Sequence, residues 1–103
     1  MTYRIEYLDS VVREDIPKLS RVVRRQVRNA IERKLASHPV EFGKPLRYSL
    51  RGARRLRVGD WRIIYKIEPP DVVVVVKIGH RREVYEDWRA RGTAARPTLR
   101  PRR

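Results

Sequence analysis

The 103-residue chain contains no cysteine, which excludes a disulfide framework and any metal site built from thiolates. Its longest apolar run, Val72–Val76, is much too short to cross a membrane, and we expect no signal peptide because the first residues lack an apolar segment. Acidic residues are also scarce, with 12 Asp and Glu against 26 Lys and Arg, which gives a formal net charge of +14. These features favour a cytoplasmic protein without a membrane partner, and they indicate a polyanion or a strongly acidic protein as its ligand.

The length of the chain fits one domain, which we place at residues 1–91. Residues 92–103 contain two prolines, four arginines and no acid, and Leu99 is their only large apolar residue. A segment of this composition cannot bury enough apolar surface to fold by itself. We therefore expect a basic, disordered tail, which could contribute a salt-sensitive contact with rRNA or only aid solubility.

The apolar pattern predicts a strand, two helices, three further strands and a short helical turn, in that order. Alternation around Ile5 indicates the first strand, and apolar residues three and four apart indicate helices from Ser10 and from Ser20 to about Ser37. Pro17 makes the first helix short or kinked because it lacks a backbone donor. The expected fold class is therefore α+β, with two N-terminal helices packed on one face of a small, mainly antiparallel four-stranded sheet, and a short C-terminal helix.

The segment 52–68 carries the strongest functional signal, since it indicates two strands joined by a Gly-Asp turn. Side chains alternate between the two faces of a strand, so Arg55 and Arg57 share one face, and Arg62 joins them from the second strand. Three guanidinium groups on one sheet face predict a surface that binds phosphate. Arg62 could also be a plain surface charge, and the arginines of the second helix are more typical of a solvated amphipathic face.

The other face of this hairpin is apolar. Trp61 and Tyr65 belong to it, and they fit a core better than a platform for base stacking. The next run, Val72–Ile78, is apolar on both faces almost to its end, which indicates a central strand. It leads into Gly79–Tyr85, where basic groups and an aromatic hydroxyl follow a glycine.

The chain resembles the RelE/ParE superfamily of type II toxins, with the RelE-like branch favoured. The resemblance covers about residues 2–89 and depends on four segments that occur in the family's order and spacing. These are Gly43-Lys44-Pro45-Leu46-Arg47 after the helices, Leu50-Arg51-Gly52 before the basic strand, Gly59-Asp60-Trp61-Arg62-Ile63-Ile64-Tyr65, and Ile78-Gly79-His80-Arg81-Arg82-Glu83-Val84-Tyr85.

The resemblance implies a ribosome-dependent endoribonuclease that cleaves mRNA in the A site and needs no metal or cofactor. The family's catalytic positions fall on Arg62, Arg81 and Tyr85, and its basic-strand positions fall on Arg55 and Arg57. The resemblance also implies an acidic antitoxin as partner, with operator DNA bound only through the antitoxin complex. From the local charge we add three residues to the expected RNA- and phosphate-binding set: Arg54, His80 and Arg82.

The basic strand departs from the family pattern, because the positions that are commonly lysine are arginine here. Arginine does not lose its proton at neutral pH, so Arg55 and Arg57 are poor general bases. Tyr85 is the better candidate, since surrounding positive charge favours its ionised form. His80 is the alternative, because imidazole titrates near neutrality, although alternation with Arg81 could direct it toward the core.

Two other functions remain open. A ParE-like toxin of this fold would poison DNA gyrase and would not be a nuclease. A degenerate toxin would only bind its antitoxin. The presence of the arginine and tyrosine set favours the nuclease, whereas the missing lysines leave the gyrase alternative standing.

Overall fold

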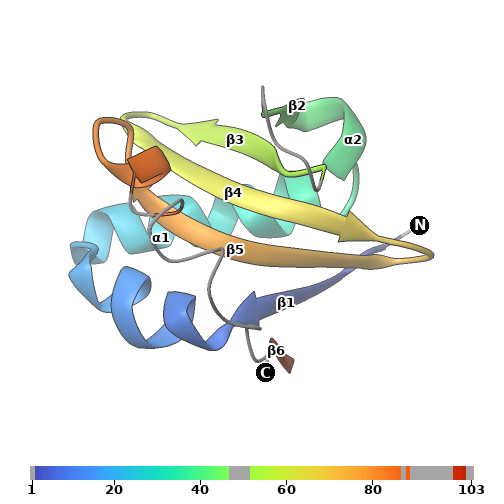
Figure 1. Ribbon diagram of the computed structural model, residues 1–103, viewed down its shortest axis with the longest axis horizontal. Coiled ribbons are helices and arrows are strands. Elements are labelled where there is room, and N and C mark those ends of the chain that lie inside the picture. The colour runs from blue at the N-terminus through green and yellow to red at the C-terminus, as the bar shows by residue number, and fades with distance from the viewer. Residues whose placement is uncertain (1, 47–51, 87, 89–98, 102–103) are drawn as a thin grey trace.

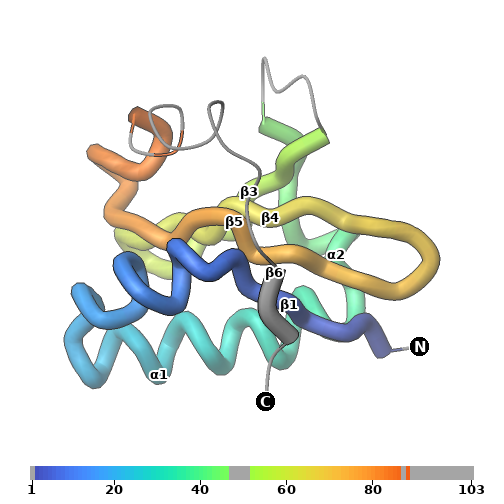
Figure 2. Tube along the Cα trace, turned by 60° about the horizontal axis from the view of Figure 1, so that its bottom comes forward, coloured from blue at the N-terminus to red at the C-terminus, as the bar shows by residue number. Residues whose placement is uncertain are grey.

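Strand β5 (Val72–His80) lies in the middle of the sheet, as its apolar character on both faces predicted. The computed structural model describes residues 2–46, 52–86, 88 and 99–101. In it, β5 pairs antiparallel with β4 (Trp61–Glu68) and parallel with β1 (Arg4–Leu8). The whole sheet has the order β2-β3-β4-β5-β1-β6 (Figure 1). Helix α1 lies below the sheet in Figure 2, and the helical turn that follows β5 lies on the opposite side.

Two short edge strands complete the sheet. β2 (Lys44–Pro45) pairs with β3 (Arg54–Val58), and β6 (Leu99–Pro101) pairs with the outer edge of β1. The predicted α+β class and the mainly antiparallel sheet are confirmed, but the sheet has six strands where four were expected. The two extra strands have only two and three residues, which is too short for alternation to be visible in the sequence.

The first helical segment follows β1 directly. It is π-helical at η1 (Val11–Asp15) and tightens to a 3₁₀ turn at η2 (Ile16–Lys18), which contains Pro17. The helix is therefore short, as expected from Pro17, and it ends where the chain becomes extended at Leu19.

The second helical segment consists of α1 (Arg21–Ala30) and the π-helical turn η3 (Ile31–Leu35). Ser20 caps it, since its side-chain oxygen accepts a hydrogen bond of 3.2 Å from the Val23 N–H. The connection after this helix contains one more short helix, α2 (Pro39–Phe42).

Both faces of the sheet are covered near its centre. On the helix side, Leu56, Ile63 and Ile78 are neighbours across three strands, and all three are buried. On the opposite side, the chain after β5 folds back in a helical turn at 84–86, and Val84 is fully buried there. A Cβ atom at Gly79 would lie only 3.2 Å from Val84, so the small residue permits this close packing.

The predicted short C-terminal helix is present in its described part, at 84–86 and 88. The tail expected to be disordered, 92–103, lies mostly outside the described residues. The part that is described, Leu99–Pro101, forms β6 against β1, which the composition did not predict.

Arg54 and Tyr65 face each other across β3 and β4 and tie the sheet to α2. The Tyr65 hydroxyl donates a hydrogen bond of 2.6 Å to the Pro39 carbonyl, and Arg54 Nη2 donates to the carbonyls of Val40 and Gly43 at 2.8 and 2.9 Å. Burial raises the pKa of Tyr65, while the nearby Arg54 guanidinium opposes this effect, so the hydroxyl keeps its proton and remains a donor. A Cβ atom at Gly43 would overlap the Tyr65 hydroxyl, which explains the glycine.

Replacing Tyr65 by phenylalanine is expected to lower the free energy of unfolding by about 1–3 kcal/mol, because the buried Pro39 carbonyl loses its donor. Urea denaturation measures this change. Tyr3→Phe is the matched control, since the half-buried Tyr3 hydroxyl has no hydrogen-bond partner among the described residues. Equal stability of the two variants would show that the Tyr65 hydrogen bond contributes nothing net.

A buried ion pair holds the first helical segment against β5. Lys77 Nζ lies 2.9 Å from Asp15 Oδ1, and Asp15 Oδ2 accepts a hydrogen bond of 3.0 Å from the Ile78 N–H. Asp15 is 2% exposed and Lys77 is 4% exposed. The pairing of β1 with β5 ends at Tyr7 and Val75. Beyond this point the Asp15 carboxylate accepts the β5 backbone hydrogen bond that a strand carbonyl would otherwise accept.

Candidate active site

Three arginines of the β3–β4 hairpin, Arg55, Arg57 and Arg62, lie on the sheet face away from α1, as strand alternation predicted. Arg57 is directly opposite Arg62, and Arg55 is opposite Ile64. Arg57 is exposed, Arg55 is half-buried and Arg62 is only 8% exposed. Like charges directly opposite each other destabilise a sheet. A bound anion would relieve the repulsion between Arg57 and Arg62.

Arg62 holds the β3–β4 turn from inside. Its Nη1 atom donates to the carbonyls of Gly59 and Trp61, both at 2.9 Å. Its neighbour on β5 is Gly79, which has no side chain and leaves room for the guanidinium. Gly59 itself has φ of +60°, a left-handed conformation that glycine adopts without strain. Arg62 therefore stabilises the turn and offers little surface to a ligand.

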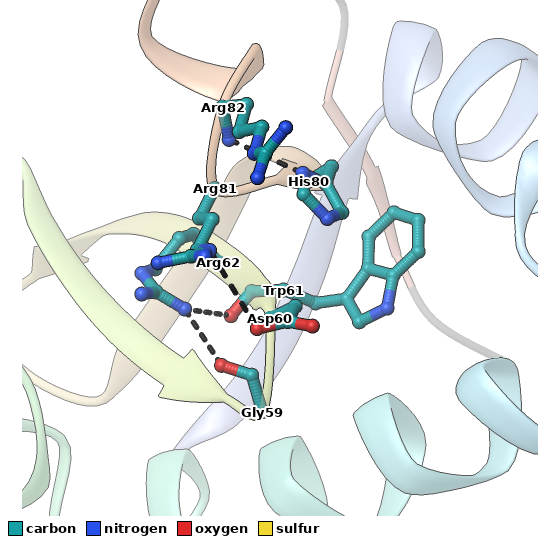
Figure 3. A network of polar contacts seen from close by, with 7 residues as sticks. All are labelled: Gly59, Asp60, Trp61, Arg62, His80, Arg81 and Arg82. Carbon is teal, nitrogen blue, oxygen red and sulfur yellow. Dashed lines mark hydrogen bonds and ion pairs between the residues drawn. The ribbon is translucent and has the colours of Figure 1, made fainter.

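Arg81 is the exposed guanidinium beside the same turn. Its backbone N–H donates to the Asp60 carbonyl at 2.8 Å, and its Nε lies 3.6 Å from Asp60 Oδ1. The Arg81 side chain is 51% exposed and that of Asp60 is 70% exposed. Figure 3 shows both Arg62 and Arg81 directed at this turn. An exposed ion pair contributes at most about 1 kcal/mol, so a phosphate can compete for Arg81.

His80 points away from Arg81. Its ring meets the Trp61 indole edge-on, with 5.4 Å between the ring centroids (Figure 3). Its Nδ1 accepts a hydrogen bond of 3.3 Å from the backbone N–H of the exposed Arg82. Alternation therefore turns His80 toward the apolar side while Arg81 faces solvent, and the arginine cluster does not include His80 or Arg54, which binds α2.

Tyr85 comes close to the basic strand. Arg55 Nη1 donates to the Tyr85 hydroxyl at 3.3 Å, although the two residues are thirty positions apart. The preceding Val84, packed on Gly79, fixes the helical turn that carries Tyr85. Arg55 Nε is buried without a hydrogen-bond partner, which leaves a donor that a phosphate oxygen could satisfy.

The arrangement can bind an anion and exchange a proton next to it. Arg57 and Arg81 supply exposed positive charge, and Tyr85 supplies a hydroxyl held by Arg55. Among the described residues, no three His, Asp or Glu side chains gather as metal ligands, and no helix there is long and apolar enough to cross a membrane.

Residues 5–85 match the family model described as the ParE toxin of the type II toxin–antitoxin system, parDE. The chain belongs to this family of the RelE/ParE superfamily. The toxin is 30% identical over 86 residues to Toxin RelG of Mycobacterium tuberculosis, a match that covers 82% of this chain and 98% of RelG. Its structure is similar to a chain of the toxin–antitoxin complex RelBE2 from the same organism, with a TM-score of 0.69, 29% identity, and coverage of 79% of the toxin and 93% of that chain.

Three features of the toxin's site were not expected from its sequence. Asp60 was taken only as a turn residue, yet it contacts Arg81. Gly79 makes room for both Arg62 and Val84. The signal that could have predicted this role is the position of the glycine opposite an arginine on the neighbouring strand. The burial of Arg62 had no signal in the sequence, because it results from the turn carbonyls that the guanidinium binds.

Proposed function

We propose that this toxin inhibits translation by cleaving mRNA in the ribosomal A site, with the RNA's own 2′-hydroxyl as nucleophile. The observation that supports the proposal is the contact of 3.3 Å between the Tyr85 hydroxyl and the Arg55 guanidinium, which joins the last turn to the basic strand. Further support comes from the exposed Arg57 and Arg81 on the same margin of the sheet.

In the proposed reaction, the 2′-oxygen attacks the adjacent phosphorus and the bond from phosphorus to the 5′-oxygen breaks. A proton leaves the 2′-hydroxyl and a proton reaches the 5′-oxygen, and Tyr85 exchanges one of them. Arg81 and Arg57 bind the phosphate oxygens and stabilise the charge of the transition state. Neither step requires a cofactor.

The other expected residues take supporting roles in this proposal. Arg62 adds positive charge from behind the turn and keeps the turn in place. Arg82 is exposed and can contact more distant phosphates. Arg54 and His80 are not included, because their contacts lie on the helix side of the sheet.

The proposed partners follow from charge and from the comparisons. A net charge of +14 favours an acidic antitoxin and also rRNA contacts on the ribosome, which would place the toxin in the cytoplasm. The similar RelBE2 chain was solved as a toxin–antitoxin complex, which supports an antitoxin for this toxin. Operator DNA would be bound only through that complex.

A second function is favoured by one finding, the match to the ParE family, whose gyrase-directed members have this fold. Purified toxin added to a translating extract separates the two. We expect mRNA breaks at fixed positions within codons, read by primer extension, and none after prior addition of antitoxin. Intact mRNA together with trapped gyrase–DNA complexes would reject the nuclease proposal and establish the alternative.

A further inference from the structure

The two arginines at the β3–β4 turn differ in what they offer to a ligand. Arg62 is 8% exposed and binds the carbonyls on both sides of Asp60, so its contacts fix the backbone from which Asp60 projects. Arg81 is half exposed and meets Asp60 through its backbone N–H and its Nε. Arg62 therefore stabilises the backbone of the turn, whereas the exposed Arg81 side chain is accessible to a ligand.

We propose that Asp60 is a positioning residue for Arg81, and this inference rests on the proposed function in which Arg81 binds an RNA phosphate. The Asp60 carboxylate engages the guanidinium at Nε, 3.6 Å away. The two terminal nitrogens of Arg81 have no hydrogen-bond or ion-pair partner among the described residues. They form the fork that matches two oxygens of one phosphate.

Holding one edge of the guanidinium reduces the number of conformations that Arg81 loses when it binds. A long exposed arginine gives up considerable side-chain entropy on contact with a ligand, and a contact already made in the free protein lowers that loss. The negative charge of Asp60 acts in the opposite direction, since it repels the phosphate. Orientation and charge must therefore be separated experimentally.

Asp60→Asn and Asp60→Ala remove the same charge, but only asparagine keeps a side-chain oxygen at the position 3.6 Å from Arg81 Nε. We expect the alanine variant to bind a 2′-O-methyl single-stranded RNA, which cannot be cleaved, about threefold to fivefold more weakly than the asparagine variant. The same ratio should appear in KM for mRNA cleavage, with kcat less affected. In an Arg81→Ala background the two Asp60 variants should bind equally.

A second readout follows Arg81 directly. The Nε–H proton of Arg81, observed by ¹⁵N NMR of the full chain, should exchange with water faster in Asp60→Ala than in Asp60→Asn. Asp71→Asn is the matched charge control, because Asp71 lies in the β4–β5 turn and its carbonyl accepts from the Arg4 N–H. It should leave both the RNA affinity and the Arg81 signal close to those of the unchanged protein.

The outcomes are distinguishable. If Arg81→Ala weakens RNA binding but the two Asp60 variants bind alike, the positioning role is wrong and the proposed function stands. A difference that persists in the Arg81→Ala background would show that Asp60 acts on the turn alone and would also overturn the inference. If Arg81→Ala binds RNA as tightly as the unchanged protein, both the phosphate contact and the positioning role are wrong.

Discussion

Replacing Tyr85 by phenylalanine is expected to lower the rate of mRNA cleavage about 10²–10⁴-fold, the usual contribution of general acid–base catalysis. The change keeps the ring and removes the hydroxyl that accepts from Arg55 at 3.3 Å. The arginines can bind phosphate and stabilise charge, but they cannot accept a proton at neutral pH. Cleavage should be measured in single-turnover experiments on programmed ribosomes.

The matched control is Tyr3→Phe, which removes a hydroxyl near the start of the chain, before β1, and should leave cleavage unchanged. RNA affinity of Tyr85→Phe should stay within about threefold of the unchanged protein, because the exposed cations remain. Undiminished cleavage by Tyr85→Phe would remove Tyr85 from proton transfer. Since His80 points to the apolar side, water would then be the remaining proton carrier to test.

Replacing Asp15 by alanine is expected to lower the free energy of unfolding by about 3–5 kcal/mol. The substitution removes the carboxylate that lies 2.9 Å from the Lys77 ammonium, which is 4% exposed, and it removes the acceptor of the Ile78 N–H. The free energy of unfolding of natural domains is only about 5–15 kcal/mol, so the variant should be partly unfolded at growth temperature. Chemical denaturation monitored by tryptophan fluorescence gives the value.

Two further variants define the cause. In Asp15→Ala with Lys77→Met, the buried charge is absent, and a substantial part of the lost stability should return. Arg13→Ala removes the ion pair of 3.0 Å between Asp9 and an arginine side chain that is 69% exposed, in the same helical segment, and should cost no more than about 1 kcal/mol. If Asp15→Ala were no more destabilising than Arg13→Ala, burial of the pair would not matter for stability.

Local patterns were sufficient for the parts of the fold that depend on neighbouring residues. The cap at Ser20, the shortening at Pro17 and the Gly59–Asp60 turn each follow from the chemistry of one or two residues. Alternation also placed Arg55, Arg57 and Arg62 on one face correctly. The same rule puts Arg54 on the opposite face. The only reason to group it with the phosphate-binding arginines is that it is a basic residue next to them in the sequence.

The remaining features depend on contacts between distant segments. Lys77 interrupts an apolar strand, and nothing near it in the sequence indicates that Asp15 is its partner. The contact between Arg55 and Tyr85 depends on how closely the last turn packs on Gly79. Arg62 is buried because its guanidinium binds backbone carbonyls of the turn, and the direction of these carbonyls cannot be read from the sequence.

The parallel pairing of β1 with β5 has a consequence for how the toxin is made. Arg4 pairs with Val72, so the strand that leaves the ribosome first waits for one of the last. Contacts of such high sequence separation slow folding, because a long loop must close before they form. A nascent chain that ends before β5 cannot build the centre of the sheet or present Arg81 and Tyr85. It follows that synthesis of the toxin is nearly complete before the protein can act on any target in the cell.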